Sequence, residues 1–473
     1  MPRPAVQAAV AALALGLCWL IAGTLGARAG YDSSWHVIWA QDLLAGRSPS
    51  LDAWAAPTEH PLLVAIALLA APFGPRASQA MVALDLFALL LVCPALIRLT
   101  GACFGSRASG AVAWLVLAGA YGLLLAALRG YLDVWFVLLV VVAATRHAEH
   151  GGDGAGAIPI GLAGLLRPEG WLIAAAAAID SMIRRDRQAA IRYSAATLVP
   201  PALWFGIDQA VTGNALLSID TARTLALEGD GGGPIRVIAA SLLGGVRGPA
   251  TLLGAIGLVL AWKVVGLRRL RTPLAIGAIG LGSAAGIAIL GLTVLPRYLM
   301  LAWLALSIFA GYAVGGWSSP GLSDSLRARW RVAGLCALVL GAVGAGALGA
   351  PAKLADEVAI DRSMGRDLGA LLAEPSVRRG LECGPLTFPS FRLIPDAILV
   401  LDDRSIEVRG RALDPIPETG VAVVVTGGGE TVAGRYSRPG IDLPVDEAVP
   451  AGFTPAGTSG DLSAFVRCSA VSR

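Results

Sequence analysis

Long apolar runs alternate with short polar connections over the first three quarters of the chain. Many of these runs approach the roughly 20 residues that an α-helix needs to cross a bilayer. The pattern therefore predicts a polytopic, all-α membrane domain with about eleven transmembrane helices. The expected spans are Ala5–Leu25, Met81–Ile97, Ala111–Leu128, Val134–Ala144, Ala155–Leu166, Trp171–Ile183, Tyr193–Ile207, Pro249–Trp262, Pro273–Val294, Leu299–Val314 and Val332–Leu348.

A twelfth apolar run, Pro61–Ala71, is too short to span and is closed by Pro72 and Pro75. We expect a re-entrant or interfacial helix there. With eleven spans and the N-terminus in the cytoplasm, every connection on the cytoplasmic side carries Arg or Lys, as the positive-inside rule requires. If Pro61–Ala71 were a full span, Arg98 and Arg184 would lie outside.

This topology places the polar tail outside the cytoplasm. We expect a transmembrane domain over residues 1–350 and a small extracytoplasmic α+β domain over residues 351–473. The expected elements of the tail are a helix at Arg362–Glu374 and strands at Ala397–Asp402, Ser405–Arg409 and Gly420–Thr426.

Cys383 and Cys468 are the only cysteines in the tail. Because an extracytoplasmic compartment is oxidising, we expect them to form a disulfide. The other four cysteines fall in or beside apolar segments, where small buried side chains are expected.

Composition agrees with a multi-pass protein of the cell membrane. The chain is 56% apolar, and its mean hydropathy is +0.69. The net charge of +4 comes from arginines in short loops and not from one basic stripe, which argues against a nucleic-acid partner. Only Lys263 and Lys353 are lysines, which suggests a bacterium with a GC-rich genome. The first segment has no convincing cleavage site, so we expect it to be retained.

A carboxylate, Asp32, follows the first span and opens a helix-like stretch. It can cap that helix, or it can act as a general base. His36, Glu59 and His60 belong to the same outer segment and extend the candidate site. Their spacing matches no standard zinc signature, so a divalent metal stays an open option.

A second carboxylate, Asp133, lies in the first turn of a span, near Arg129 and Tyr131. Ionisable groups at such positions usually face a cavity or a partner. The alternative is a local Arg129–Asp133 pair four residues apart.

Two further charged turns lie on the predicted outer side. Arg167 and Glu169 form either the polar floor of a cavity or a surface hairpin turn, and the structural alternative is a pair between the two side chains. Arg297 and Tyr298 follow a span, where the planar guanidinium suits a lipid phosphate. The alternative is a snorkelling arginine with an interfacial tyrosine.

These motifs, in this order and on this side, resemble the GT-C superfamily of membrane glycosyltransferases that use polyprenyl-phosphate sugars, in particular the mannosyl-, arabinosyl- and RgtA/B/C/D-like group. The resemblance extends from about Ala5 to Val314. It rests on Asp32, Glu59-His60-Pro61-Leu62-Leu63, Asp133, Leu166-Arg167-Pro168-Glu169-Gly170, the Trp204–Asn214 stretch and Pro296-Arg297-Tyr298.

The resemblance implies transfer of a hexose or pentose, with inversion, at the extracytoplasmic face. The donor would be a polyprenyl-phosphate sugar, and the acceptor an envelope glycan, lipid or protein. Asp32 would be the catalytic base, Asp133 would arrange the acceptor or a metal, and Arg297 would neutralise the leaving phosphate. The chain departs from the family's best-known members because it lacks a clear second acid beside Asp133, so a requirement for a metal does not follow from the resemblance, and a divalent metal stays an alternative. Substrate contacts are expected from His36, Glu59, His60, Arg129, Tyr131, Arg167, Glu169, Arg297 and Tyr298.

Two other functions fit part of the pattern. Acids within the membrane and broken helices are also found in transporters and lipid flippases, although this chain shows no pair of related halves. A membrane-anchored assembly protein, with a tail that binds a partner, is the third alternative. The large polar region around Asp32 argues against it.

Overall fold

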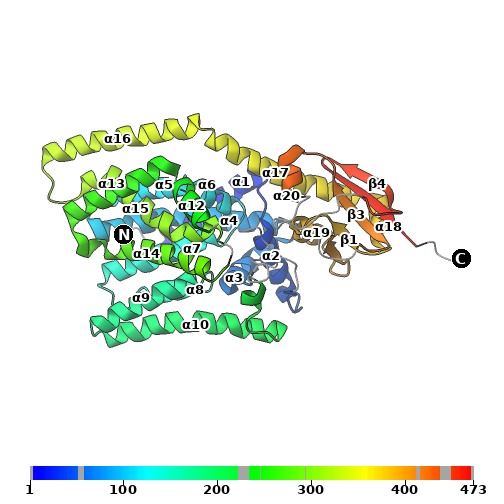
Figure 1. The fold of residues 1–473 in the computed structure, drawn as a ribbon, viewed down its shortest axis with the longest axis horizontal. Coiled ribbons are helices and arrows are strands. Elements are labelled where there is room, and N and C mark those ends of the chain that lie inside the picture. Colours follow the sequence, from blue (N-terminus) through cyan, green and yellow to red (C-terminus); the bar gives the residue numbers. More distant parts are fainter. Residues whose placement is uncertain are drawn as a thin grey trace.

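The computed structural model describes residues 4–51, 58–221, 234–245, 247–292, 294–411, 416–436 and 449–469. A bundle of helices forms one part of the molecule, and a sheet with short helices forms the other (Figure 1). The long helix α16 (Asp324–Ala347) runs along the bundle, and α17 (Ala350–Ala373) leads from it into the C-terminal part. The molecule is therefore a polytopic helical protein with a small C-terminal α+β region, as the sequence predicts.

Each of the eleven predicted spans overlaps at least one helix. Ala111–Leu128 is divided into two helices that meet at an angle of 71°. Among the described residues, six helices are long and apolar enough to cross a membrane, or seven if the bent pair counts as one span. The number eleven thus stays a prediction. The helices are α1 (Pro4–Leu25), α4 (Ala77–Phe104), α5 (Arg107–Ala118), α6 (Tyr121–Leu128), α7 (Asp133–Glu149), α8 (Ala157–Gly164), α9 (Glu169–Ile183), α10 (Arg187–Thr212), α13 (Arg247–Val265), α14 (Leu267–Ile289), α15 (Met300–Gly315) and α16.

The short apolar run after the first span forms α3 (Pro61–Ala70). A 3₁₀ turn, η1 (Ala71–Arg76), separates it from α4, and Gly74 in this turn has a φ of 56°. An L-residue with a side chain rarely adopts that conformation, so the glycine permits the break. The run is therefore a separate short helix, which agrees with its expected length.

Helix α15 lies at the centre of the bundle, because nearly all of its residues are buried. A Cβ added to Gly311 would overlap the backbone of α5 at Ser109. Small residues allow helices in a membrane to approach this closely. The turn before α15 is η2 (Pro296–Leu299), so the burial of α15 fixes the position of that turn. Helix α12 (Pro234–Gly245) packs nearby, and the indole of Trp303 donates a hydrogen bond to the carbonyl of Ser241.

The C-terminal part contains a five-stranded sheet in the order β2-β1-β3-β5-β4. Strand β1 is parallel to both of its neighbours, and β5 is antiparallel to both of its own. The elements are α18 (Pro375–Leu381), β1 (Leu386–Phe388), η4 (Phe391–Leu393), α19 (Ile394–Leu401), β2 (Val408–Gly410), β3 (Gly420–Val425), α20 (Gly429–Tyr436), β4 (Thr454–Ser459) and β5 (Leu462–Arg467).

The predicted helix at Arg362–Glu374 and strand at Gly420–Thr426 are present, as the second half of α17 and as β3. Only the end of the strand predicted at Ser405–Arg409 forms, in β2. The strand predicted at Ala397–Asp402 is wrong, because α19 occupies it. A short apolar run does not distinguish a strand from a buried helix, and Pro395 in the first turn favours the helix.

Helix α2 (Tyr31–Leu44) belongs to the core of the C-terminal part. Its side chains Trp35, Ile38 and Trp39 are buried in one cluster with Leu368 of α17 and Val421 of β3. The predicted division at residue 350 therefore does not separate two hydrophobic cores, because a segment near the N-terminus completes the second one.

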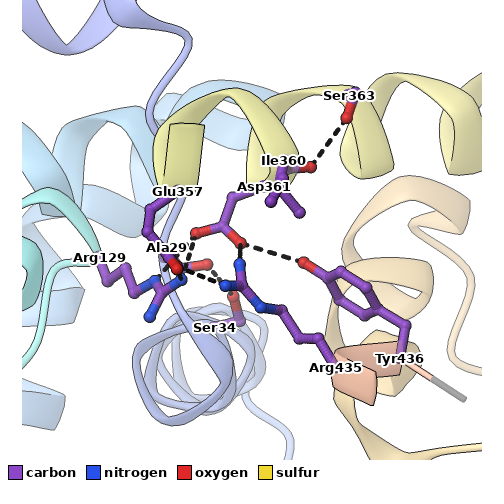
Figure 2. A network of polar contacts seen from close by, with 9 residues as sticks. All are labelled: Ala29, Ser34, Arg129, Glu357, Ile360, Asp361, Ser363, Arg435 and Tyr436. Atoms are coloured by element: carbon purple, nitrogen blue, oxygen red, sulfur yellow. Dashed lines mark hydrogen bonds and ion pairs between the residues drawn. The ribbon is translucent and has the colours of Figure 1, made fainter. Parts of the chain in front are cut away.

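A network of charges joins the bundle to α17 (Figure 2). Arg129, just after α6, donates hydrogen bonds to Asp361 at 2.9 Å and to Glu357 at 3.0 Å. Arg435 of α20 binds the same two carboxylates, and the hydroxyl of Tyr436 donates to Asp361 at 3.1 Å. The local Arg129–Asp133 pair considered above is therefore wrong, because Arg129 points to α17.

We predict that Cys383 and Cys468, which the structure joins in a disulfide across 85 residues, are bonded in the purified protein. By the chain-entropy estimate, closing so long a loop stabilises the folded state by about 4–5 kcal/mol. Thiol alkylation of the denatured protein without reductant should modify Cys336, which lies in α16 and has no disulfide partner, and should leave the tail cysteines unmodified. Labelling of both tail cysteines at the rate of Cys336 would contradict the prediction.

We predict that Arg129→Gln destabilises the protein by about 1–3 kcal/mol, because it leaves two partly buried carboxylates short of a partner. Arg98→Gln is the matched control. Arg98 also pairs with a glutamate, Glu149, but its side chain is 63% exposed, and such pairs contribute little. Thermal unfolding in detergent and proteolysis of the tail provide the measurement. Equal effects of the two substitutions would show that the network does not hold the tail.

Candidate active site

The first turn of α2 is fixed against the loop before α7. The amide of Gly30 donates to the carbonyl of Arg129 at 2.7 Å, and the hydroxyl of Ser33 donates to the carbonyl of Gly130 at 2.6 Å. A Cβ on Gly30 would collide with the ring of Tyr131, so only glycine permits this approach. The two helices that begin with the candidate acids are thus held together at one end of the bundle.

Asp32 forms an ion pair with Arg297, at 2.9 Å between Oδ2 and a guanidinium nitrogen. The side chain of Asp32 is 20% exposed and that of Arg297 is 38% exposed. The residue at the N-cap of α2 is Gly30, and no side chain caps this helix. The alternative in which Asp32 serves as the cap is therefore wrong. The acid is available to a partner outside its own helix.

Asp133 is held by Arg167, and Arg167 is held by Glu169. The distances are 2.6 Å and 3.0 Å, and all three side chains are almost fully buried. The ring of Tyr298 lies 5.2 Å from the Arg167 guanidinium carbon, within reach of a cation–π interaction. The alternative in which Arg167 and Glu169 form a hairpin turn at the surface is therefore wrong. The expected Arg167–Glu169 pair is present, with Asp133 as a third member.

Two histidines stack beside these charges. The rings of His36 and His60 lie 5.7 Å apart and nearly parallel. Burial lowers the pKa of His36 to about 4, so its imidazole is neutral near pH 7. Burial and the neighbouring cations also lower the pKa of His60. Neutral imidazoles can donate or accept hydrogen bonds here, but they add no positive charge.

The neutral form of His36 has a defined proton position. Its Nδ1 lies 2.7 Å from the carbonyl oxygen of Asp32, so Nδ1 carries the hydrogen. Its Nε2 is then an acceptor, and it is buried without a hydrogen-bond partner in the described part of the chain. That acceptor is free for a hydroxyl donor.

A third group of polar residues adjoins His60. Burial raises the pKa of Glu59, and the nearby carboxylate of Asp208 raises it further. Asp208 is fully buried and lies close to the amide and hydroxyl of Ser218. The ring of His60 packs edge-on against Trp204 of the same helix as Asp208. Asp208 was not expected in the site, although it belongs to the Trp204–Asn214 stretch on which the resemblance rests.

Arg129 and Tyr131 face the C-terminal part, and the phenol of Tyr131 also lies near Asp32 and Arg297. With Tyr31 and Arg392, Arg129 and Tyr131 line a cavity of about 70 Å³ between α2 and the C-terminal part. Arg129 is occupied by the carboxylates of α17. The structure therefore brings six of the expected site residues to one polar centre: Asp32, Asp133, Arg167, Glu169, Arg297 and Tyr298. Arg129 lies instead at the interface with the tail.

The described residues do not suit a metal ion held by the protein alone. Within the described ranges, no three His, Cys, Asp or Glu side chains lie close enough to share an ion. Asp133 and Glu169 are both bound by Arg167. What the centre offers is a carboxylate for a proton, the guanidinium group of Arg297 for an anion and aromatic rings for an apolar chain or a sugar face.

Neither a protein-family model nor a curated protein sequence matches the chain. Among solved structures, the fold is similar to the crystal structure of ArnT from Cupriavidus metallidurans in the apo state. The match covers 98% of each chain with a TM-score of 0.55 and 14% sequence identity. Similarity at this identity concerns the fold alone. The chain therefore has a fold similar to that of ArnT.

Proposed function

We propose that the protein is a membrane glycosyltransferase of the GT-C type. It transfers a sugar from a polyprenyl phosphate to an envelope glycan, lipid or protein at the extracytoplasmic face. The observation that carries this proposal is the contact between Asp32 and Arg297, 265 residues apart in sequence. A candidate base and a candidate phosphate ligand meet at the end of the bundle that carries the tail.

The proposed reaction needs two kinds of group, a base for the acceptor hydroxyl and a cation for the leaving phosphate. Asp32 takes the proton of an acceptor hydroxyl, and that oxygen forms a bond to the anomeric carbon. The bond between this carbon and the phosphate oxygen breaks, and its electron pair stays on the phosphate. Arg297 stabilises the charge that develops there. Base catalysis and fixed charge of this kind are the main means of lowering such a barrier.

Asp32 cannot act as the base, and Arg297 cannot bind the leaving phosphate, while the two side chains are paired with each other. In an inverting displacement the acceptor and the leaving phosphate lie on opposite sides of the sugar. The Asp32–Arg297 pair therefore opens when substrates bind. We propose that the donor phosphate replaces Asp32 at Arg297 and so frees the carboxylate to accept a proton.

The buried Asp133–Arg167–Glu169 group acts differently in this proposal. Its guanidinium is already held by two carboxylates, so it binds no substrate phosphate strongly. We assign it a positioning role, in which it supports Tyr298 next to Arg297. Breaking such a group leaves an unpaired buried charge, which costs about 3–5 kcal/mol. Substitutions there are thus expected to reduce folding as well as activity.

We predict that Asp32→Asn lowers transfer by about 10²–10⁴-fold, the usual effect of removing a general base. Asp42→Asn is the matched control. Asp42 lies on the same helix and is also paired, with Arg47 at 2.6 Å and Arg404 at 3.2 Å, but it does not contact Arg297. The measurement is release of polyprenyl phosphate from a labelled donor by purified protein. Wild-type turnover by Asp32→Asn would refute the assignment of the base.

We predict that Arg297→Lys lowers kcat/KM by about 10–100-fold, because Lys gives up the planar fork that binds two phosphate oxygens. If the guanidinium of Arg297 stabilises the leaving phosphate in the transition state, weakening this interaction should lower kcat and kcat/KM together. Arg98→Lys, at an exposed pair, serves as the control. If Arg297→Lys kept full activity, Arg297 would be a charge partner of Asp32 and not a phosphate ligand.

A further inference from the structure

A second cavity, of about 370 Å³, lies where α7, α8, α9, α10 and α14 meet. Its wall is apolar and includes Ile160, Ile173 and Ile276. Its rim is made by the end of α9 and the start of α14, which carry arginines. The volume lies within the roughly 300–1,000 Å³ of ordinary ligand sites. None of the residues that line it belongs to the polar centre around Asp32.

The rim has an excess of positive charge. Arg184 is occupied, since it pairs with Asp180 at 2.8 Å and donates to the carbonyls of Gly151 and Gly152. Arg268 and Arg271 also line the cavity, yet neither forms a hydrogen bond or an ion pair with any residue in the described ranges. Two guanidinium groups are therefore free to bind an anion.

These two arginines stand at an unfavourable place in their helix. Both lie in the first five residues of α14, whose first turn contains no acid. The N-terminal end of a helix carries partial positive charge, so cations there raise the energy of the free protein. An external anion would relieve this repulsion.

We propose that this cavity binds the phosphate of an anionic membrane phospholipid. Arg268 and Arg271 hold the phosphate, and the first carbons of the lipid lie against the isoleucine wall. Guanidinium forks match phosphate oxygens, and basic pockets between membrane helices bind anionic head groups. The apolar wall favours a lipid over a free ion. In the predicted topology this lipid belongs to the cytoplasmic leaflet, the opposite face from Asp32.

The test compares lipid binding by wild-type protein and matched variants in detergent. The probes are phosphatidylglycerol, phosphatidylcholine with the same chains, and inorganic phosphate. Arg268→Gln/Arg271→Gln should weaken phosphatidylglycerol binding by about tenfold or more. The control is Lys263→Gln/Arg269→Gln, which removes one exposed charge from the last turn of α13 and one from the first turn of α14, both outside the cavity. This control should bind as the wild type does.

A second variant keeps the arginines and fills the cavity. Ala275 lines it and is exposed, so Ala275→Phe should fold and should still weaken phosphatidylglycerol binding. Equal losses in the two double variants would mean that the arginines act only through general charge near the membrane surface, and the proposal would fail. It would also fail if phosphatidylcholine bound equally well, or if inorganic phosphate bound as tightly as the lipid.

Discussion

The guanidinium of Arg297 and the carboxylate of Asp32 lie 2.9 Å apart, and the rest of the site depends on such pairing. Each of these groups would be costly at the end of an apolar bundle without a partner. Asp133, Arg167 and Glu169 meet the same requirement by a buried chain of two ion pairs. The first pair is more exposed than the second group. In the proposed mechanism it is therefore the pair that substrates open, while the buried group keeps its geometry.

The C-terminal part is coupled to this site through the loop before α7. That loop is bonded to the first turn of α2 on one side and, through Arg129, to Glu357 and Asp361 of α17 on the other. Figure 2 shows the two carboxylates of α17 facing Arg129 and Arg435 together. Since α2 is also packed into the core of the C-terminal part, a shift of the tail would move the helix that carries Asp32.

Local patterns predicted the helices well, because an apolar run of sufficient length leaves the backbone few other solutions. They also singled out charged residues that the structure brings together, since an acid or arginine beside a span is unusual. Local patterns could not predict which residues distant in the sequence pair with each other in the fold. Arg129 was considered as a local partner of Asp133. Arg129 instead pairs with Asp361 of α17, and Asp133 pairs with Arg167 in the turn before α9. The strand expected at Ala397–Asp402 failed for another reason: its eight-residue helix has too few turns to show a helical period. Asp208 belongs to the Trp204–Asn214 stretch on which the resemblance rests, but no local pattern showed that it lies near Glu59.

The most direct test of the central claim places purified protein in liposomes with a polyprenyl-phosphate sugar labelled on the sugar, together with an envelope acceptor extract. The proposed chemistry predicts that the label moves to the acceptor on the side where the tail is exposed, with inversion at the anomeric carbon, and that free polyprenyl phosphate appears in equal amount. Movement of the intact donor from one leaflet to the other, without cleavage of the sugar–phosphate bond, would contradict the account and favour a lipid transporter.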